Sequence, residues 1–159
     1  MNAEMWRLIG NMDKAEAFYN ESMDISYKIG STGMYTIDHF NKSFVSIAKG
    51  NYSEAKTLIQ KYYLLATPKG EEPKDAYGLI ALAYLLEQEH NYNGAHEVAS
   101  VTRRLFKEQN IFPEPPDEKP LLAVEKAIQE NLDEATRQKI SEASTSESVK
   151  SLLDKYLEI

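Results

Sequence analysis

GNYSEA at residues 50–55 decides the fold, because similar stretches recur along the chain: GNMDKA at 10–15, HNYNGA at 90–95 and ENLDEA at 130–135. Each copy starts 40 residues after the one before it. A fixed period of this length indicates that one supersecondary unit is repeated, and that neighbouring units bury each other's apolar surfaces. The sequence therefore predicts a linear array of repeats.

Each repeat is expected to be a pair of helices joined by the recurring stretch. Apolar residues in 75–89 recur at helical spacing, and a second apolar stripe follows from Tyr92 to Phe106. Gly10 and Gly50 suit the left-handed conformation that ends a helix, and the Asn that follows in all four copies is a preferred N-cap for the next helix. The unit is therefore predicted to be a helical hairpin.

Side chains near the predicted turns support these boundaries. Glu54 and Glu134 each follow the Asn by three residues, as the acidic partner of a capping box does. The six prolines lie in two stretches, two of them in 67–74 and four in 113–120, and proline disrupts helix interiors. Both stretches are predicted to connect repeats, with Pro120 in the first turn of the helix that follows.

Composition excludes several classes of partner. The chain has 159 residues, 42% of them hydrophobic, which is enough for one core. The net charge is -7, and residues 108–134 hold eight acids against two lysines, so a nucleic acid would be repelled. The longest apolar run, 79–86, is too short to cross a membrane. The chain lacks cysteine, which favours a reducing compartment, and a cytoplasmic location is expected.

Catalysis has no sequence support. His39, His90 and His96 show no metal-ligand spacing, and the acid pair Glu71-Glu72 has no nucleophile or histidine near it in sequence. We expect a protein that is not an enzyme and that uses no metal and no cofactor.

The two-helix unit resembles the tetratricopeptide repeat (TPR). Its best copy spans 76–106, where the family's signature positions match in order at Leu79, Leu82, Ala83, Leu86, Tyr92, Ala95 and Ala99. The family's period is about 34 residues, whereas 40-residue versions look like the C-terminal repeat domains of large bacterial signalling proteins. The resemblance implies one domain over residues 1–159, a right-handed α-α superhelix of about 3.5 helical hairpins with a C-terminal capping helix near 146–158.

In such a superhelix the first helices of the repeats line a concave groove. Matching positions in each copy predicts a partner-binding groove lined by Phe40, Asn41, Phe44, Tyr77, Ile80, Ala81, Tyr84, Gln88 and Val124. Exposed aromatic residues on a concave surface are typical anchors for a partner. For Ile47 and Ile80, burial between adjacent repeats is an equal alternative.

The predicted function is a non-catalytic scaffold that binds a protein or peptide segment in this groove. One alternative is a ligand-sensing domain of a larger bacterial regulator, such as an ATPase, a cyclase or a transcription activator. Another is a homo-oligomerisation element, with a homodimer through the N-terminal edge or the C-terminal helix. The sequence does not identify the partner.

The two ends of the chain differ from the repeats. Only nine residues precede Gly10, so Trp6 and Leu8 could cover part of the helix expected from Met12 to Ile29, and the chain is expected to be part of a longer protein. At the other end, Ser144 and Glu147 resemble a capping box. They precede an apolar stripe that could close the last repeat or pair with a second copy: Val149, Leu152, Leu153, Tyr156 and Leu157.

Overall fold

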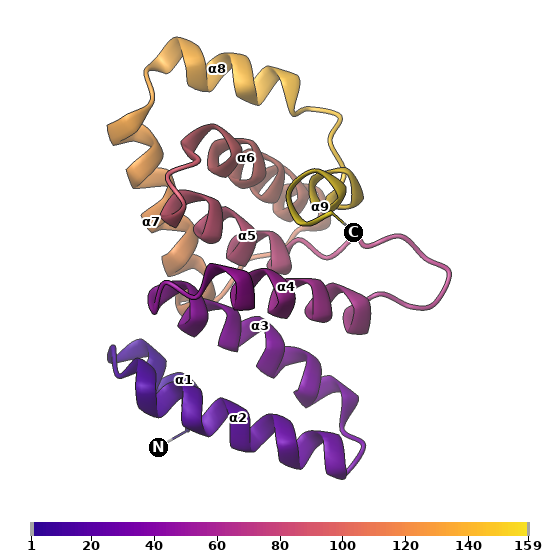
Figure 1. The fold of residues 1–159 in the computed structure, drawn as a ribbon. Helices are drawn as coiled ribbons and strands as arrows, with labels where there is room; N and C mark the ends of the chain where they lie inside the picture. Colours follow the sequence, from indigo (N-terminus) through magenta and orange to yellow (C-terminus); the bar gives the residue numbers. More distant parts are fainter. Residues whose placement is uncertain (1, 159) are drawn as a thin grey trace. The chain divides into compact units, whose positions relative to one another are not determined.

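Residues 2–158 are described by a computed structural model, in which they form nine helices and no strand (Figure 1). The prediction of an all-α protein is confirmed. The chain divides into two compact units, Met1–Glu71 and Glu72–Ile159, which we call unit 1 and unit 2. The boundary between them lies in the proline-containing connection 67–74. That the whole chain forms one domain stays a prediction.

Unit 1 consists of four helices in which each packs against the next. They are α1 (Ala3–Leu8), α2 (Met12–Lys28), α3 (Thr32–Ala48) and α4 (Tyr52–Ala66). Successive helices run in opposite directions (Figure 1). The predicted helix Met12–Ile29 is confirmed to within one residue. α1, by contrast, has only six residues, so it lies beside the first part of α2 and leaves the rest of that side without a neighbouring helix.

Unit 2 is built around two central helices. Its members are α5 (Tyr77–Gln88), α6 (Tyr92–Gln109), α7 (Pro115–Asn131), α8 (Glu134–Ala143) and α9 (Val149–Leu157). α5 packs against α6 and α7, and α6 also packs against α7 and α8. Each helix of the α5–α6 hairpin therefore has more than one neighbour, which explains why α5 is buried over most of its length.

Three of the four recurring stretches form the same turn. Gly10, Gly50 and His90 have positive φ angles of 85°, 75° and 60°. The N–H of the next residue then bonds to the carbonyl five residues earlier, as Asn51 does to Ser46 at 2.8 Å. This is a Schellman motif, which ends one helix and reverses the chain into the next. Glycine adopts this conformation without strain, whereas His90 does so at a cost.

The predicted N-cap forms in the first and third copies of the recurring stretch but not in the second copy. Asn11 and Asn91 accept hydrogen bonds from the backbone N–H three residues later, at 3.2 and 3.0 Å. Asn51 makes no such bond. The Glu54 carboxylate does not close a capping box because it accepts hydrogen bonds from Lys42 and Ser46 of α3, at 2.9 and 2.8 Å. In the second copy, the Glu54 carboxylate of α4 therefore binds side chains of α3 instead of capping its own helix.

The fourth copy does not form the predicted turn. Asn131 is the last residue of α7, and Asp133 is the N-cap of α8, accepting from the Thr136 N–H at 2.9 Å. Ala135 is exposed, whereas the corresponding alanines of the other three copies are buried. The N-cap role predicted for Asn131 is wrong because α7 continues through Asn131, and the chain leaves the helix through Leu132, an extended residue instead of a left-handed one.

The start of α7 also differs from the prediction, which placed residues 113–120 in a connection between repeats. Pro115 and Pro116 occupy its first turn, where a missing N–H has no intrahelical partner to lose. Pro120 lies inside the helix rather than in its first turn. It removes the N–H that would bond to the carbonyl of Pro116, which is one hydrogen bond close to the helix start. The connection is therefore shorter than the sequence predicted.

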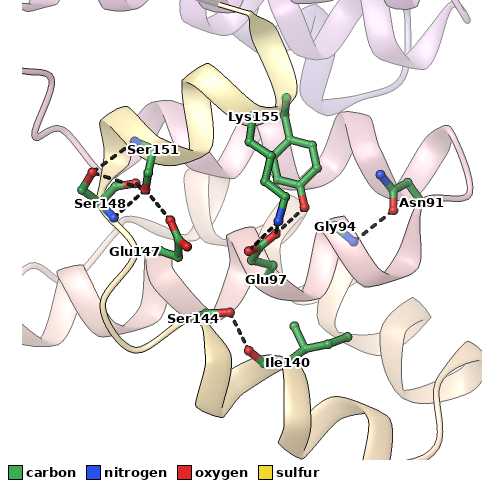
Figure 2. A network of polar contacts seen from close by, with 10 residues as sticks. Asn91, Gly94, Glu97, Ile140, Ser144, Glu147, Ser148, Ser151 and Lys155 are labelled. Carbon is green, nitrogen blue, oxygen red and sulfur yellow. Dashed lines mark hydrogen bonds and ion pairs between the residues drawn. The ribbon is translucent and has the colours of Figure 1, made fainter.

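The last helix starts three residues later than expected and uses a different cap. Ser148 caps α9 together with Ser151, in a reciprocal capping box (Figure 2). The predicted pair does not form this cap. The Ser144 hydroxyl donates to the carbonyl of Ile140 at 2.6 Å, at the end of α8, and the Glu147 carboxylate accepts from the Ser151 hydroxyl.

Glu97 of α6 holds α9 in place (Figure 2). Its carboxylate accepts hydrogen bonds from Lys155 Nζ, at 2.8 and 2.9 Å, and from the hydroxyl of Tyr156. Burial, followed by this hydrogen bond, raises the pKa of Tyr156 above its usual range. The apolar stripe of α9 is buried: Val149, Leu152, Leu153 and Leu157. That stripe is thus already covered within one chain.

The Schellman turn predicts opposite effects for two glycine-to-alanine substitutions in unit 1. Gly50→Ala should destabilise the unit by about 1 kcal/mol because alanine is strained at positive φ. Gly33→Ala, at an exposed helical position with open space around it, should be neutral or stabilising by less than about 1 kcal/mol. Urea unfolding followed by the fluorescence of Trp6, the single tryptophan, measures both. Equal effects would contradict the turn assignment.

The contacts of Glu97 predict that the hydroxyl of Tyr156 matters more than the Lys155 ammonium. Tyr156→Phe should cost about 1 kcal/mol, because the lost bond is partly buried and its acceptor is charged. Lys155→Met should cost less than about 0.5 kcal/mol, since the lysine side chain is 53% exposed. Hydrogen exchange of the α9 amides should therefore accelerate more in Tyr156→Phe. The reverse order would show that the ion pair is the main anchor.

Candidate functional site

Five of the nine residues predicted to line a groove lie in the hydrophobic core: Phe40, Phe44, Ile80, Ala81 and Val124. The ring of Phe40 packs edge-on against Phe44 and beside Tyr62, with centroid distances of 5.1 and 5.4 Å. A partner could reach these side chains only if the core opened. Their placement on an exposed surface is therefore corrected, and burial, the stated alternative for Ile80, is what the structure shows.

The other four predicted residues are partly exposed. Tyr77, Tyr84 and Gln88 belong to α5 of unit 2, and Asn41 belongs to α3 of unit 1. The ring of Tyr77 packs against Phe106, with centroids 5.4 Å apart. Asn41 has a different setting, because it borders a hollow of its own unit.

This hollow lies between α2 and α3 and has a volume of about 430 Å³. The start of α1 borders it at one end, through Asn2, Ala3 and Glu4. Apolar side chains from α2 and α3 form most of its lining, and four of them are unusually exposed: Phe18 (40%), Ile25 (49%), Ile29 (69%) and Met34 (56%). We call this site the α2–α3 hollow.

The hollow exists because α1 is short. A helix rises about 1.5 Å per residue, so the six residues of α1 extend for about 9 Å, whereas the 17 residues of α2 extend for about 25 Å. Only the first part of α2 is covered, as Figure 1 shows. The uncovered part of α2 still carries the apolar residues that a neighbouring helix would bury.

Asp38 is the main polar group of the hollow. It is only 9% exposed, and its Oδ2 atom accepts a hydrogen bond from the Ser22 hydroxyl at 2.6 Å. Its second oxygen, Oδ1, has no hydrogen-bond partner within residues 2–158. Burial raises the pKa of the Asp38 carboxyl, although the bond from Ser22 and the charge of His39 act in the opposite direction. Oδ1 is not one of the fully buried atoms that lack a partner among the described side chains, so this oxygen stays accessible while Oδ2 is held by Ser22.

Further polar groups beside Asp38 are also unsatisfied. The hydroxyl of Ser26 is buried and has no hydrogen-bond partner among the described residues. The hydroxyl of Tyr19 is also buried and lies beside the Arg7 guanidinium, whose charge favours the ionised phenol. Burial raises the pKa of Tyr19 to about 12, so its hydroxyl stays protonated and can donate. The side-chain amide of Asn41 likewise makes no hydrogen bond within the described part of the chain. Of these groups, only Asn41 is partly exposed, so a bound molecule could use its amide, whereas the two hydroxyls are covered.

The hollow is acidic as well as apolar. Glu4, Glu21 and Asp38 belong to its lining, which includes no lysine, arginine or histidine. Unit 1 as a whole is balanced, with eight acidic and eight basic residues. The local excess of acid is therefore a property of this site and not of the whole unit.

Sequence reasoning identified Asn41 but missed the rest of the hollow. The groove was inferred from the first helices of the repeats, whereas most of the hollow is formed by α2, a second helix. A signal was present: Phe18, Ile25 and Ile29 share one apolar side of a helix that only a nine-residue segment precedes. A comparison of the expected lengths of α1 and α2 would have shown that part of this apolar side of α2 has no helix to cover it.

The three histidines all take part in hydrogen bonds within the described part of the chain. His39 contacts the Tyr35 carbonyl, His90 the Tyr92 hydroxyl and His96 the Arg137 carbonyl, at 2.7, 3.1 and 2.9 Å. Within residues 2–158, no group of three or more His, Asp or Glu side chains is arranged to hold a metal ion. No helix in the same range is long and apolar enough to cross a membrane.

Comparisons with known proteins give no relative. The chain matches no protein-family model, no curated protein and no solved structure. The structure itself defines an all-α protein of antiparallel helices, and the functional argument must come from its surface.

The environment of Asp38 predicts that Asp38→Asn stabilises unit 1 at neutral pH. The wild-type carboxylate is ionised there and poorly solvated, whereas asparagine carries no charge and can still accept from Ser22. Because the folded-state pKa is raised, protonation removes this cost as the pH falls through that pKa towards the unfolded value of 3.8. The advantage of Asp38→Asn should therefore shrink over this range.

Urea unfolding at several pH values, monitored by Trp6 fluorescence, measures this difference. Asp24→Asn is the matched control, because Asp24 is 60% exposed and pairs with Lys28 on the surface of α2. It should change the free energy of unfolding by less than about 0.5 kcal/mol at any pH. A wild type that is more stable than Asp38→Asn at neutral pH would show that the carboxylate is well solvated or paired.

Proposed function

We propose that this chain is a non-catalytic docking module that binds a helical segment of a partner protein in the α2–α3 hollow. The observation that carries the proposal is the exposed apolar lining of that hollow, which begins beside the N-terminal end of α1. An apolar surface of this kind lowers its free energy when another helix covers it, and amphipathic helices bind proteins in such grooves.

The proposed function is the one predicted from the sequence, but the binding site is the α2–α3 hollow and not the groove of the first helices. The 40-residue period and the three Schellman turns support a TPR-like arrangement, extended into a right-handed superhelix. In that architecture the hollow would occupy the position of an incomplete first hairpin. The absence of cysteine supports a cytoplasmic module.

The expected affinity is modest. Full burial of an aliphatic or aromatic side chain contributes about 1.5–3 kcal/mol, and the four exposed lining residues are already partly covered. Ordering of the ligand and loss of its translational freedom oppose this gain. A dissociation constant in the micromolar range corresponds to about 8 kcal/mol and fits this balance.

A second candidate function is sensing of a small ligand, as part of a larger bacterial regulator. The volume of the hollow favours it, because small-molecule sites enclose about 300–1,000 Å³. The two functions differ in how much of the hollow the ligand covers. A small molecule would occupy one part of it, whereas a helix would contact the whole exposed side of α2.

Panning a display library of stapled helical peptides of about 12 residues against the protein tests the docking function. The double variant Ile25→Ser with Ile29→Ser should bind the recovered peptides at least tenfold more weakly, because both side chains line the hollow. Leu64→Ser with Leu65→Ser is the control, since these residues are exposed at 70% and 39% on α4, outside the hollow. It should bind like the wild type.

Failure to recover any peptide, or equal weakening in both double variants, would overturn the docking function. Sedimentation of the unliganded protein at several concentrations separates it from homo-oligomerisation. Self-association that is lost only in the Ile25 and Ile29 variant would mean that a second copy of the chain fills the hollow.

A further inference from the structure

The length of the uncovered part of α2 sets the length of its occupant. α2 has 17 residues and α1 has six, so about 11 residues of α2 have no helix beside them on this side. At about 1.5 Å per residue, this corresponds to about 16 Å, or three helical turns. An occupant of this length would lie in line with α1, ending near Asn2, Ala3 and Glu4.

The apolar residues on both sides of the hollow determine where the occupant helix must carry apolar residues. Phe18, Ile25 and Ile29 approach from α2, and Met34 approaches from α3. An occupant between two helices meets both through apolar residues on a broad stripe, at i, i+3, i+4 and i+7. Its remaining face stays in water and can be polar.

The charges of the hollow select a basic ligand. Glu4, Glu21 and Asp38 all belong to the lining, and an acidic helix would be repelled by them. Nearby cations are already engaged: Lys42 with Glu54 at 2.9 Å, and Lys28 with Asp24 at 2.5 Å.

Arg7 of α1 does not pair with Asp38 either, although its Nε and Nη2 atoms are buried and make no hydrogen bond to the described residues. Its guanidinium lies over the ring of Phe44, 5.3 Å from the centroid, and 3.7 Å from the Glu4 carboxylate. No described cation is therefore paired with Asp38, whose neighbours are the hydroxyl of Ser22 and the adjacent His39.

The second oxygen of Asp38 is the specific point of recognition. Asp38 is only 9% exposed, and its Oδ1 atom has no donor among residues 2–158 but is not fully buried, so a ligand can reach it. Lysine and arginine can extend their apolar stems along the hollow while the charged end reaches such a carboxylate. A charge-assisted hydrogen bond to Oδ1 would then complete the coordination that Ser22 begins.

We infer that the α2–α3 hollow binds an amphipathic helix of about three turns from a partner protein, aligned with α1, and that a lysine or arginine of this helix pairs with Asp38. The inference rests on the proposed docking function and adds the length, the charge and the pairing residue of the ligand. Asn41 lies three residues after Asp38 on α3, which places its amide beside this pair, available to a polar side chain or the backbone of the ligand.

A double-substitution experiment tests the pairing directly. The probe is a hydrocarbon-stapled, end-capped helix of about 12 residues with one apolar stripe and one lysine. Its counterpart carries norleucine in place of the lysine, which keeps the stem and removes the charge. Both peptides are titrated against the wild type and against Asp38→Asn by fluorescence anisotropy.

Replacing lysine by norleucine should weaken binding to the wild type at least about tenfold, and to Asp38→Asn less than about twofold, because the charge then has no partner. Glu21→Gln is the control, since this acid of the lining is exposed. In that variant the norleucine effect should remain within about threefold of the wild-type effect, because an exposed charge contributes little.

The outcomes separate the inference from the proposed function. If both peptides bind the wild type equally, or if the norleucine effect is the same in Asp38→Asn, docking stands and the pairing is overturned. If neither peptide binds and the library also gives none, the docking function itself fails. Preferential binding of acidic helices would overturn the charge assignment.

Discussion

The left-handed residue at the end of a helix is the constraint on which this structure depends. A single positive φ angle, at Gly10, Gly50 or His90, breaks the helix and turns the chain back. The next residue then bonds to the previous turn and starts an antiparallel helix. Gly30 does the same between α2 and α3, with the Ser31 N–H bonded to the Ser26 carbonyl at 2.8 Å. Packing of the hairpins follows from these reversals.

The repeat could be predicted from the sequence because its turn is local. A glycine and an asparagine in adjacent positions favour this backbone geometry with little help from the rest of the fold, so the helix 12–29 was predicted to within one residue. The fourth copy shows where the pattern stops being informative. The spacing is kept there, but α7 continues through Asn131 and ends at the extended residue Leu132, so the chain takes a different path between α7 and α8.

Side-chain exposure was harder to predict, because it depends on what packs against each helix. Phe40 and Phe44 occupy positions that line a groove in a regular superhelix, yet ring packing with Tyr62 contributes to their burial. The apolar residues of α2 show the opposite case. They would be core residues if α1 matched α2 in length, and they are exposed because it does not. Neither outcome follows from periodicity alone.

Asp38 has a consequence for the turnover of the protein. A carboxylate that weakens its own unit lets that unit open more often, and proteases degrade the open form. Under the proposed function, a partner that supplies the missing cation would remove this weakness and protect the unit by mass action. The cellular amount of the protein would then follow the amount of its partner, so that unpaired copies are removed.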